Sequence, residues 1–413
     1  MKFIFGEGFQ RTLGGSMMVA GTAIGAGMLA LPMISAGMWF YWSTALLLVS
    51  WFFMYRASQA LLEVNLHYQP GDSFHTLVRD LLGPAWSAAN GIAVAFVLYI
   101  LVYAYVSGGG SIIQQSLAPF LGTAPPRILS SLFFALLLAA CIWWSSRAVD
   151  RFSVLLMGGM VLTFVISVSG MLGNLRLSTL LDSAGSGGEA IFIWGAVSSY
   201  LTSFCFHASV PSLVKYMGRD GRTINKCLLA GTLMALVCYF CWITAADGLI
   251  PREQFKDVIA AGGNVGNLMQ AAGSNLDGSF ILRILETFGL LAVATSFLGA
   301  GLGLFDYIAD LCKFDDSRLG RSKTLLVTFA PPVICGLLWP DGFLLAIGWA
   351  GLAAAFWSVI VPALLLKAAR SRFAAHGYRV RGGSLLITLL LVYGVVVAIC
   401  HTLFVFDLLP MYK

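Results

Sequence analysis

The sequence predicts an all-α membrane protein with about eleven transmembrane helices. Of its 413 residues, 59% are hydrophobic and only 11% are charged, whereas roughly a quarter of a soluble domain is charged. Apolar stretches recur along the chain, and each is long enough to cross a hydrocarbon core about 30 Å thick. The stretches are continuous rather than alternating, which favours helices over a barrel.

The expected spans follow these apolar stretches in order. Residues 1–413 are expected to form a single transmembrane domain in which helices 1–5 occupy about 12–173, helices 6–10 about 190–366 and helix 11 about 385–406. The first span is expected to be retained, because no small-residue cleavage site follows it. The individual spans are expected at residues 12–35, 39–63, 86–117, 127–146, 152–173, 190–217, 224–247, 279–311, 323–338, 342–366 and 385–406.

Lysine and arginine residues in the short loops predict the orientation. With the N-terminus in the cytoplasm, 19 of the 25 basic residues lie on the cytoplasmic side of a bacterial inner membrane. An odd number of spans then places the C-terminus in the periplasm. The basic segment 367–381 lies between two spans, so it favours anionic lipid headgroups over nucleic acid as its partner. The basic residues expected outside are Arg127, Arg176, Arg252, Lys256, Arg283 and Lys413.

Two spans are expected to be discontinuous. The first contains the glycine-rich segment 21–27 followed by Pro32, and the sixth contains the segment 204–211, which ends in Pro211. Matching breaks in two halves point to the binding site of a transporter. Because the breaks open the first and sixth spans, they predict a 5+5 inverted repeat plus one extra helix. The alternative is that these glycines only allow helices to pack closely.

Unwound helices offer the chemistry that an amino acid needs. Free N–H groups at a half-helix N-terminus suit a carboxylate, and free carbonyls at a C-terminus suit an ammonium group or Na⁺. Phe204 and Phe206 beside the sixth-span break are candidates for stacking on an aromatic side chain, as are Tyr99 and Tyr103, whose i, i+4 spacing puts them on one face of the third expected span. These residues could equally be core or lipid-facing groups. The histidine at mid-membrane could contact substrate or a proton, or could only shape the break. The candidate substrate-binding residues are Thr22, Ala23, Ile24, Gly25, Ala26, Gly27, Tyr99, Tyr103, Phe204, Phe206 and His207.

A possible ion-coupling site lies near the middle of the eighth expected span. Ala292, Thr295 and Ser296 offer one carbonyl and two hydroxyls on one helix face. Such oxygens suit a hard cation such as Na⁺, with carbonyls freed by the first break completing the set. Alternatively, hydroxyls in a helix often bond to the preceding turn.

Other function classes are disfavoured by what the sequence lacks. No acid pair, Ser/His pair or metal-spaced histidine cluster indicates an enzyme, a metal site or a bound cofactor. No filter loop or ring of charge indicates a channel. The sequence Cys238-x-x-Cys241 lies inside an apolar span, where small side chains on one helix face explain it without redox or metal chemistry.

Three stretches carry a family resemblance. Residues 21–32, 203–213 and 296–310 resemble the first, sixth and eighth helices of the hydroxy/aromatic amino acid permease family, within the amino acid–polyamine–organocation superfamily, and most of all its bacterial high-affinity tryptophan permeases. The resemblance implies the 5+5 inverted repeat and import of L-tryptophan or a related aromatic amino acid, such as tyrosine or phenylalanine, with H⁺. Met160 departs from the family, where a lysine is common in the fifth helix, so sodium-coupled or uncoupled transport stays open.

Overall fold

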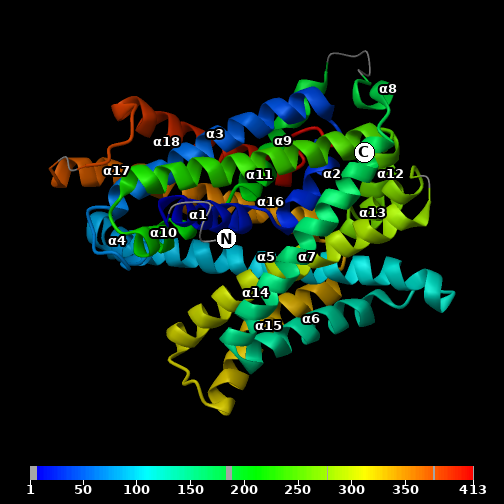
Figure 1. Cartoon of the computed structure of the whole chain (residues 1–413), viewed down its shortest axis with the longest axis horizontal. Coiled ribbons are helices and arrows are strands. Elements are labelled where there is room, and N and C mark those ends of the chain that lie inside the picture. Colours follow the sequence, from blue (N-terminus) through cyan, green and yellow to red (C-terminus); the bar gives the residue numbers. More distant parts are fainter. Residues whose placement is uncertain (1–6, 183–187, 277, 375–376, 413) are drawn as a thin grey trace.

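The computed structural model describes residues 7–182, 188–276, 278–374 and 377–412, and these residues form helices and loops without a strand (Figure 1). Within the described residues, eight helical segments are long and apolar enough to cross a membrane. The all-α class is therefore confirmed. The eight segments are α3 (Trp39–Asn65), α5 (Pro84–Leu121), α6 (Arg127–Trp144), α7 (Ser146–Gly173, with its apolar part from Arg151), α11 (Gly221–Leu249), α14 (Ser279–Cys312), the continuous stretch Phe343–Arg372, and α18 (Gly383–Val405).

The three other expected spans are helical but differ from simple spans. The first is a bent pair, and counting it would raise the number of apolar spans in the described part to nine. The sixth is divided into η2 (Glu189–Phe192), α9 (Ile193–Ser203) and α10 (Ser209–Met217), each too short to cross a bilayer alone. The ninth is α15 (Arg318–Leu338), whose first turns carry three basic residues. The count of eleven spans therefore stays a prediction.

The tenth expected span also departs from a regular helix. It consists of α16 (Phe343–Ala354), a π-helical segment η3 (Ala355–Ile360) and α17 (Val361–Arg372), which begins with Pro362 in its first turn. Short π-helical segments are frequent at functional sites. The apolar pattern of the sequence gave no sign of this segment.

Four short helices lie in connections where the sequence predicted only loops. They are too short to span a bilayer, so a search for long apolar stretches does not detect them. The first of them shows how local sequence forms such a helix: the Ser73 hydroxyl accepts the Thr76 N–H at 3.2 Å, and Gly83, at φ 92°, ends it. The four are α4 (Phe74–Leu82), α8 (Leu177–Leu180), α12 (Gln254–Ala260) and α13 (Val265–Gly273).

The helices are arranged around α5, which packs against α6, α14, α15 and α16. The first helix, α1 (Glu7–Ala23), packs against α10 and α11. In Figure 1, the short helices α8, α12 and α13 gather at the end of the molecule that carries the C-terminus, together with α2 (Leu31–Ser35). The helices α4, α10 and α17 lie at the opposite end, so the broken spans run between the two ends.

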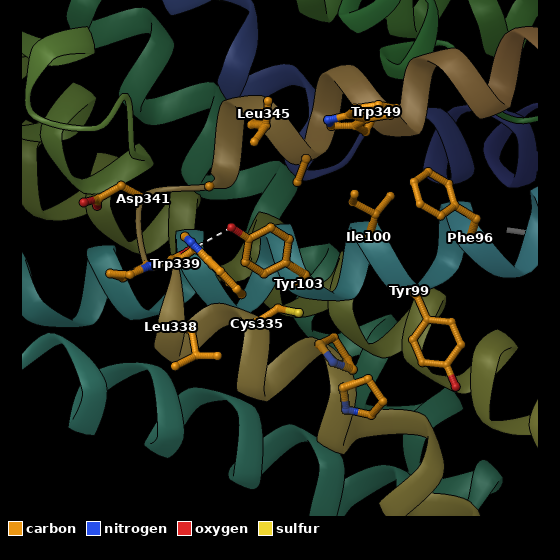
Figure 2. A pocket seen from close by; sticks show the side chains of 15 residues that line it. Phe96, Tyr99, Ile100, Tyr103, Cys335, Leu338, Trp339, Asp341, Leu345 and Trp349 are labelled. Carbon is orange, nitrogen blue, oxygen red and sulfur yellow. Dashed lines mark hydrogen bonds between the residues drawn. The ribbon is translucent and has the colours of Figure 1, made fainter. Parts of the chain in front are cut away.

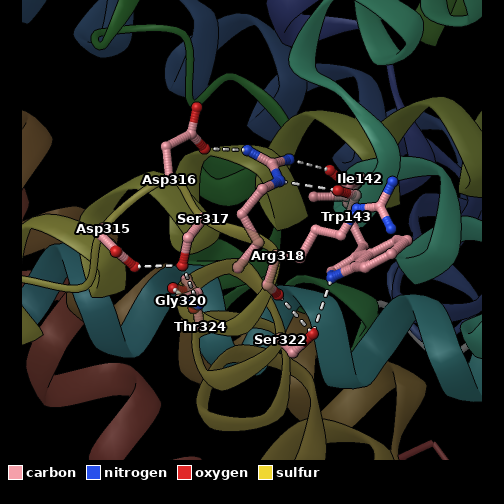
Figure 3. Close-up of polar contacts among 10 residues, drawn as sticks. Ile142, Trp143, Asp315, Asp316, Ser317, Arg318, Gly320, Ser322 and Thr324 are labelled. Carbon is pink, nitrogen blue, oxygen red and sulfur yellow. Dashed lines mark hydrogen bonds and ion pairs between the residues drawn. The ribbon is translucent and has the colours of Figure 1, made fainter.

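A polar corner joins the end of α6 to the start of α15 (Figure 3). The Arg321 guanidinium donates to the carbonyls of Ile142 and Trp143, each at 2.8 Å, and pairs with Asp316 at 2.7 Å. The Trp143 indole N–H donates to the Ser322 hydroxyl at 3.1 Å. The last carbonyls of a helix have no partner within it, and here a charged side chain from α15 provides one.

Candidate functional site

The first span is broken where the sequence predicted. Helix α1 ends at Ala23, Gly25 is fully extended, and a 3₁₀ turn, η1 (Ala26–Ala30), leads into α2. The two parts meet at an angle of 45°. The N–H of Ala26 does not continue the helix but donates to the Ser296 hydroxyl of α14 at 2.9 Å. The break therefore turns one backbone N–H toward a neighbouring span.

The sixth span is broken over residues 204–208, between α9 and α10. The side chains of Phe204, Phe206 and His207 are fully buried there. Pro211 lies in the first turn of α10, where its missing N–H costs no helical hydrogen bond. This break is thus lined by aromatic groups, whereas the first is lined by small residues.

The two breaks face each other across Tyr239 of α11. Its hydroxyl lies 2.5 Å from the carbonyl oxygen of Ala23 and 2.6 Å from that of Ser203, the last residues of α1 and α9. The Ser203 hydroxyl also donates to the Gly27 carbonyl at 3.3 Å. Because a phenolic hydroxyl has one proton, it can donate to only one of the two carbonyls at a time. Two helix C-terminal ends therefore share a single donor.

Aromatic rings surround this junction. The Phe204 ring packs against that of Tyr239, with centroids 5.0 Å apart. The Phe206 ring stacks on His207 at 5.0 Å, and His207 meets the Trp357 ring of η3 edge-on at 6.2 Å. Aromatic pairs prefer such stacked and edge-on arrangements. The π-helical segment of the tenth expected span thus contributes to the sixth-span break.

The predicted ion-coupling residues lie against the first break, but their oxygens already have partners. Ser296 accepts from the N–H of Ala26. The Thr295 hydroxyl lies 2.9 Å from the carbonyl oxygen of Leu291 and 3.1 Å from that of Ala292, and it donates its one proton to either of them. The Thr295 hydroxyl also lies 3.8 Å from the Met160 sulfur. The alternative in which a helical hydroxyl bonds to the preceding turn thus describes Thr295.

Tyr99 and Tyr103 are not brought to this junction. The Tyr99 hydroxyl donates to the carbonyl of Val327 in α15 at 3.0 Å. The Tyr103 hydroxyl donates to the carbonyl of Trp339, the residue after α15, at 2.8 Å. Both line an apolar cavity of about 730 Å³ between α5, α15 and α16 (Figure 2). Thr22 also differs from the other first-break residues, because it is exposed and its hydroxyl donates to the Met18 carbonyl at 2.7 Å. Substrate contacts by these three residues, like those by all the other candidate residues, stay predictions.

Three residues of the junction were missed by sequence reasoning. Tyr239 lies in an apolar span without a flanking glycine or proline, so its sequence carries no signal of a role at the breaks. Tyr105 of α5 is buried and interacts with the Ser296 hydroxyl. Ser203 does adjoin the predicted sixth-span break, and its position could have suggested a role.

Comparison with known proteins identifies the family. A model of the tryptophan/tyrosine permease family matches residues 9–401. The tryptophan-specific transport protein of Pseudomonas aeruginosa is 50% identical to this chain, covering 97% of it and 96% of the relative. Proteins of the same name from Shigella flexneri and Haemophilus influenzae are 48% and 47% identical, covering 97% and 93% of each chain. The family resemblance of the sequence is confirmed, and the chain, a multi-pass membrane protein, belongs to the tryptophan/tyrosine permease family.

Proposed function

We propose that this chain is a secondary active transporter that imports an aromatic amino acid, with tryptophan preferred, across the bacterial inner membrane by proton symport. The observation that carries the proposal is the junction at Tyr239, where the C-terminal ends of two broken helices meet. The relatives named as tryptophan transporters support the substrate. Tyrosine or phenylalanine is the alternative substrate, since the family name includes tyrosine.

The substrate's ammonium group binds between the carbonyls of Ala23 and Ser203. These oxygens share one hydroxyl proton, so they keep acceptor capacity for a second donor. An ammonium has three protons to donate, and the negative ends of two helix dipoles favour its charge. The carboxylate binds at the backbone of Ala23 to Gly27, where η1 begins and N–H groups precede a new helix.

The aromatic ring of the substrate stacks on Phe204 or Phe206, beside His207. These side chains are fully buried at the sixth-span break, adjacent to the Tyr239 junction through the contact between Phe204 and Tyr239. A ring that joins this cluster gains about 0.5–1.5 kcal/mol per aromatic contact beyond simple burial. The ring would thus lie on the apolar side of the junction and the zwitterionic end on the other.

The proposal includes the architecture of the spans around the junction. Eleven spans form a 5+5 inverted repeat with one further helix, the N-terminus lies in the cytoplasm and the C-terminus in the periplasm. The supporting observation is that the first and sixth expected spans are both broken near their middle. The orientation depends on the distribution of basic residues in the sequence, of which Lys2 and Lys413 lie outside the described residues.

Proton coupling is preferred over sodium coupling. The Thr295 hydroxyl donates its one proton to a helical carbonyl, that of Leu291 or that of Ala292, so a sodium ion there would have to displace this bond. Met160 brings a sulfur toward the same place, and sulfur is a poor ligand for a hard cation. Sodium coupling through Ala292, Thr295 and Ser296 is therefore the weaker candidate.

Transport by the purified chain in liposomes tests the proposal. We expect L-tryptophan to accumulate when an inward proton gradient is applied in sodium-free buffer, and the accumulation to collapse when a protonophore is added. Excess tyrosine and phenylalanine should compete more weakly than unlabelled tryptophan. Uptake that requires sodium and is lost in Thr295→Ala would refute proton coupling. Uptake that equilibrates without accumulation would refute active transport altogether.

A further inference from the structure

A second cavity, of about 380 Å³, lies between α2, α9, α16 and α18. We call it the α9–α18 cavity. Small-molecule sites range from roughly 300 to 1,000 Å³, so this cavity has room for one small ligand. Its walls come from α2, which follows the break in the first span, and from α9, which precedes the break in the sixth span. The remaining walls come from α16 and α18 of the last two expected spans. It is separate from the junction at Tyr239, which it does not include.

Aromatic rings form much of the cavity wall. Phe192 and Tyr412 meet edge-on with centroids 5.9 Å apart, and Phe404 also lines the cavity. Two glycines allow these rings to approach the backbone. A Cβ atom at Gly37 would lie 2.7 Å from the Phe192 ring, and one at Gly195 would lie 2.9 Å from the Phe404 ring. The wall therefore offers flat apolar faces, which suit a planar aromatic ligand.

One polar side chain in this wall has an atom that lacks a hydrogen bond. His401 of α18 is only 2% exposed, and its Nδ1 pairs with the Ser198 hydroxyl at 3.1 Å. Its Nε2 is buried and has no hydrogen-bond partner among the described residues. Buried polar atoms are nearly always paired, so this atom calls for a partner that a ligand in the cavity can supply.

The charge in the wall limits what that ligand can be. Asp341 is the only acidic residue among the cavity's lining residues, and its carboxyl group already accepts from the Asn264 amide at 2.5 Å. No arginine or lysine lines the cavity to balance a carboxylate or phosphate. A neutral ring with a single hydrogen-bond donor therefore fits better than a charged ligand.

We propose that the α9–α18 cavity binds an indole ring, whose N–H donates to Nε2 of His401. An indole N–H can only donate, so binding selects the tautomer in which Nδ1 carries the proton and donates to Ser198. The ring is either free indole or the side chain of tryptophan, with its amino acid end toward the cavity mouth. This site lies outside the substrate site proposed above and does not depend on it.

Saturable binding of radiolabelled indole and 1-methylindole to the full chain in detergent tests this proposal. 1-Methylindole keeps the ring but has no N–H to donate. We expect His401→Phe, which keeps an aromatic ring, to weaken indole binding by about fivefold, the effect of one hydrogen bond. The same substitution should leave the affinity for 1-methylindole within about twofold. His75→Phe is the matched control, because His75 also pairs with a serine, Ser87, but lies outside the cavity.

An equal loss of both ligands in His401→Phe would overturn the proposal, because it would indicate a distorted cavity rather than a lost hydrogen bond. No saturable indole binding in the wild type would also overturn it. If His401→Phe does not fold, Ser198→Ala provides the second variant, and it should weaken indole binding selectively because Nδ1 loses its partner.

Gly25→Val separates this site from the central one. If the proposed function is right, this variant loses tryptophan uptake, yet indole binding with its dependence on His401 should remain. L-Tryptophan that also binds this variant through His401 would show that the cavity accepts the amino acid's side chain, and binding of indole alone would show that it accepts the free ring. Indole binding that disappears in Gly25→Val would place it in the central site and refute the inference.

Discussion

The ends of three helices are completed in two different ways. At the end of α6, the guanidinium of Arg321 donates to two carbonyls and also pairs with a carboxylate (Figure 3). At the ends of α1 and α9, two carbonyls share the one hydroxyl of Tyr239. The first arrangement has as many donors as its acceptors need, and the second has fewer.

The difference separates a structural corner from a site that can bind. Charge-assisted hydrogen bonds are short and fix geometry, so the α6–α15 corner holds two expected spans in a set arrangement. A hydroxyl between two carbonyls is neutral, and it leaves one acceptor free for a group that arrives later. A helix end at membrane depth whose carbonyls have too few hydrogen-bond donors therefore indicates a binding site. A helix end whose carbonyls all have donors indicates a rigid part of the scaffold.

The largest effect on transport is expected at Gly25. An added Cβ there would lie 2.6 Å from the Ser296 hydroxyl, the atom that accepts the Ala26 N–H. Overpacking of this kind costs about 1–3 kcal/mol, so Gly25→Ala should lower the tryptophan uptake rate roughly tenfold or more. Initial rates in membranes with matched expression measure this.

Two variants control the Gly25 prediction. At Gly299 of α14, no heavy atom lies within 4 Å of an added Cβ, so Gly299→Ala should keep near-normal uptake. In Gly25→Ala/Ser296→Ala the clashing oxygen is gone and the nearest Ser296 atom, its Cβ, is 3.8 Å away, so uptake should partly recover. Equal losses in both alanine variants would contradict the steric explanation.

The rigid corner should affect stability rather than transport. Arg321→Met removes hydrogen bonds from a charged donor, each worth about 1.5–3 kcal/mol, and leaves the α6 carbonyls without their partner. We expect a clear fall in thermal unfolding temperature in detergent, with the KM for tryptophan within about twofold. Arg318→Met is the control, because Arg318 is exposed at the start of the same helix. A raised KM with normal stability would show that this corner acts in substrate binding rather than in stabilising the fold.

Tyr239→Phe should show the opposite pattern. The variant keeps the ring but removes the hydroxyl between the carbonyls of Ala23 and Ser203. The hydroxyl also holds the ends of α1 and α9 together, so without it the two carbonyls are no longer fixed around the ammonium group. We expect the KM for tryptophan to rise about three- to tenfold, with a loss of stability of about 1 kcal/mol. Tyr393→Phe is the matched control, because its buried hydroxyl pairs with Ser50 at 3.3 Å between α18 and α3, outside both broken spans. If both variants raise KM equally, Tyr239 has no special role in binding.

The sequence predicted the parts of this site that depend on backbone conformation. Glycine at 25 and 27 and proline at 211 limit helix continuity, so both breaks could be located from residue types alone. Tyr239 could not be located, because a tyrosine in an apolar span looks the same whether its hydroxyl meets lipid headgroups or a broken helix. Its role depends on helix packing between segments more than 30 residues apart.

Long apolar stretches in the sequence predicted the long helices of the fold, but no pattern in the sequence predicted the short helices. The bounds of α11 and α14 lie within a few residues of the predicted ranges, because hydropathy changes sharply at their ends. The short α12 and α13 and the π-helical η3 depend on tertiary packing and interrupted hydrogen bonding, which a hydropathy pattern does not record. The spacing between Tyr99 and Tyr103 correctly placed them on one helix face, but it could not tell which neighbour that face meets.

The smallest effect is expected at Tyr103. Its hydroxyl donates to the Trp339 carbonyl, and its ring lines the cavity between α5, α15 and α16 rather than the junction (Figure 2). Tyr103→Phe removes one hydrogen bond worth about 0.5–1.5 kcal/mol to the fold, so tryptophan affinity should stay within about twofold. Phe206→Leu should instead weaken affinity by about two- to tenfold, because an aromatic contact at the sixth-span break is lost. Equilibrium tryptophan binding to both purified variants measures the contrast. A tenfold loss in Tyr103→Phe, with Phe206→Leu unaffected, would move the aromatic site to the α5 face and away from the broken helices.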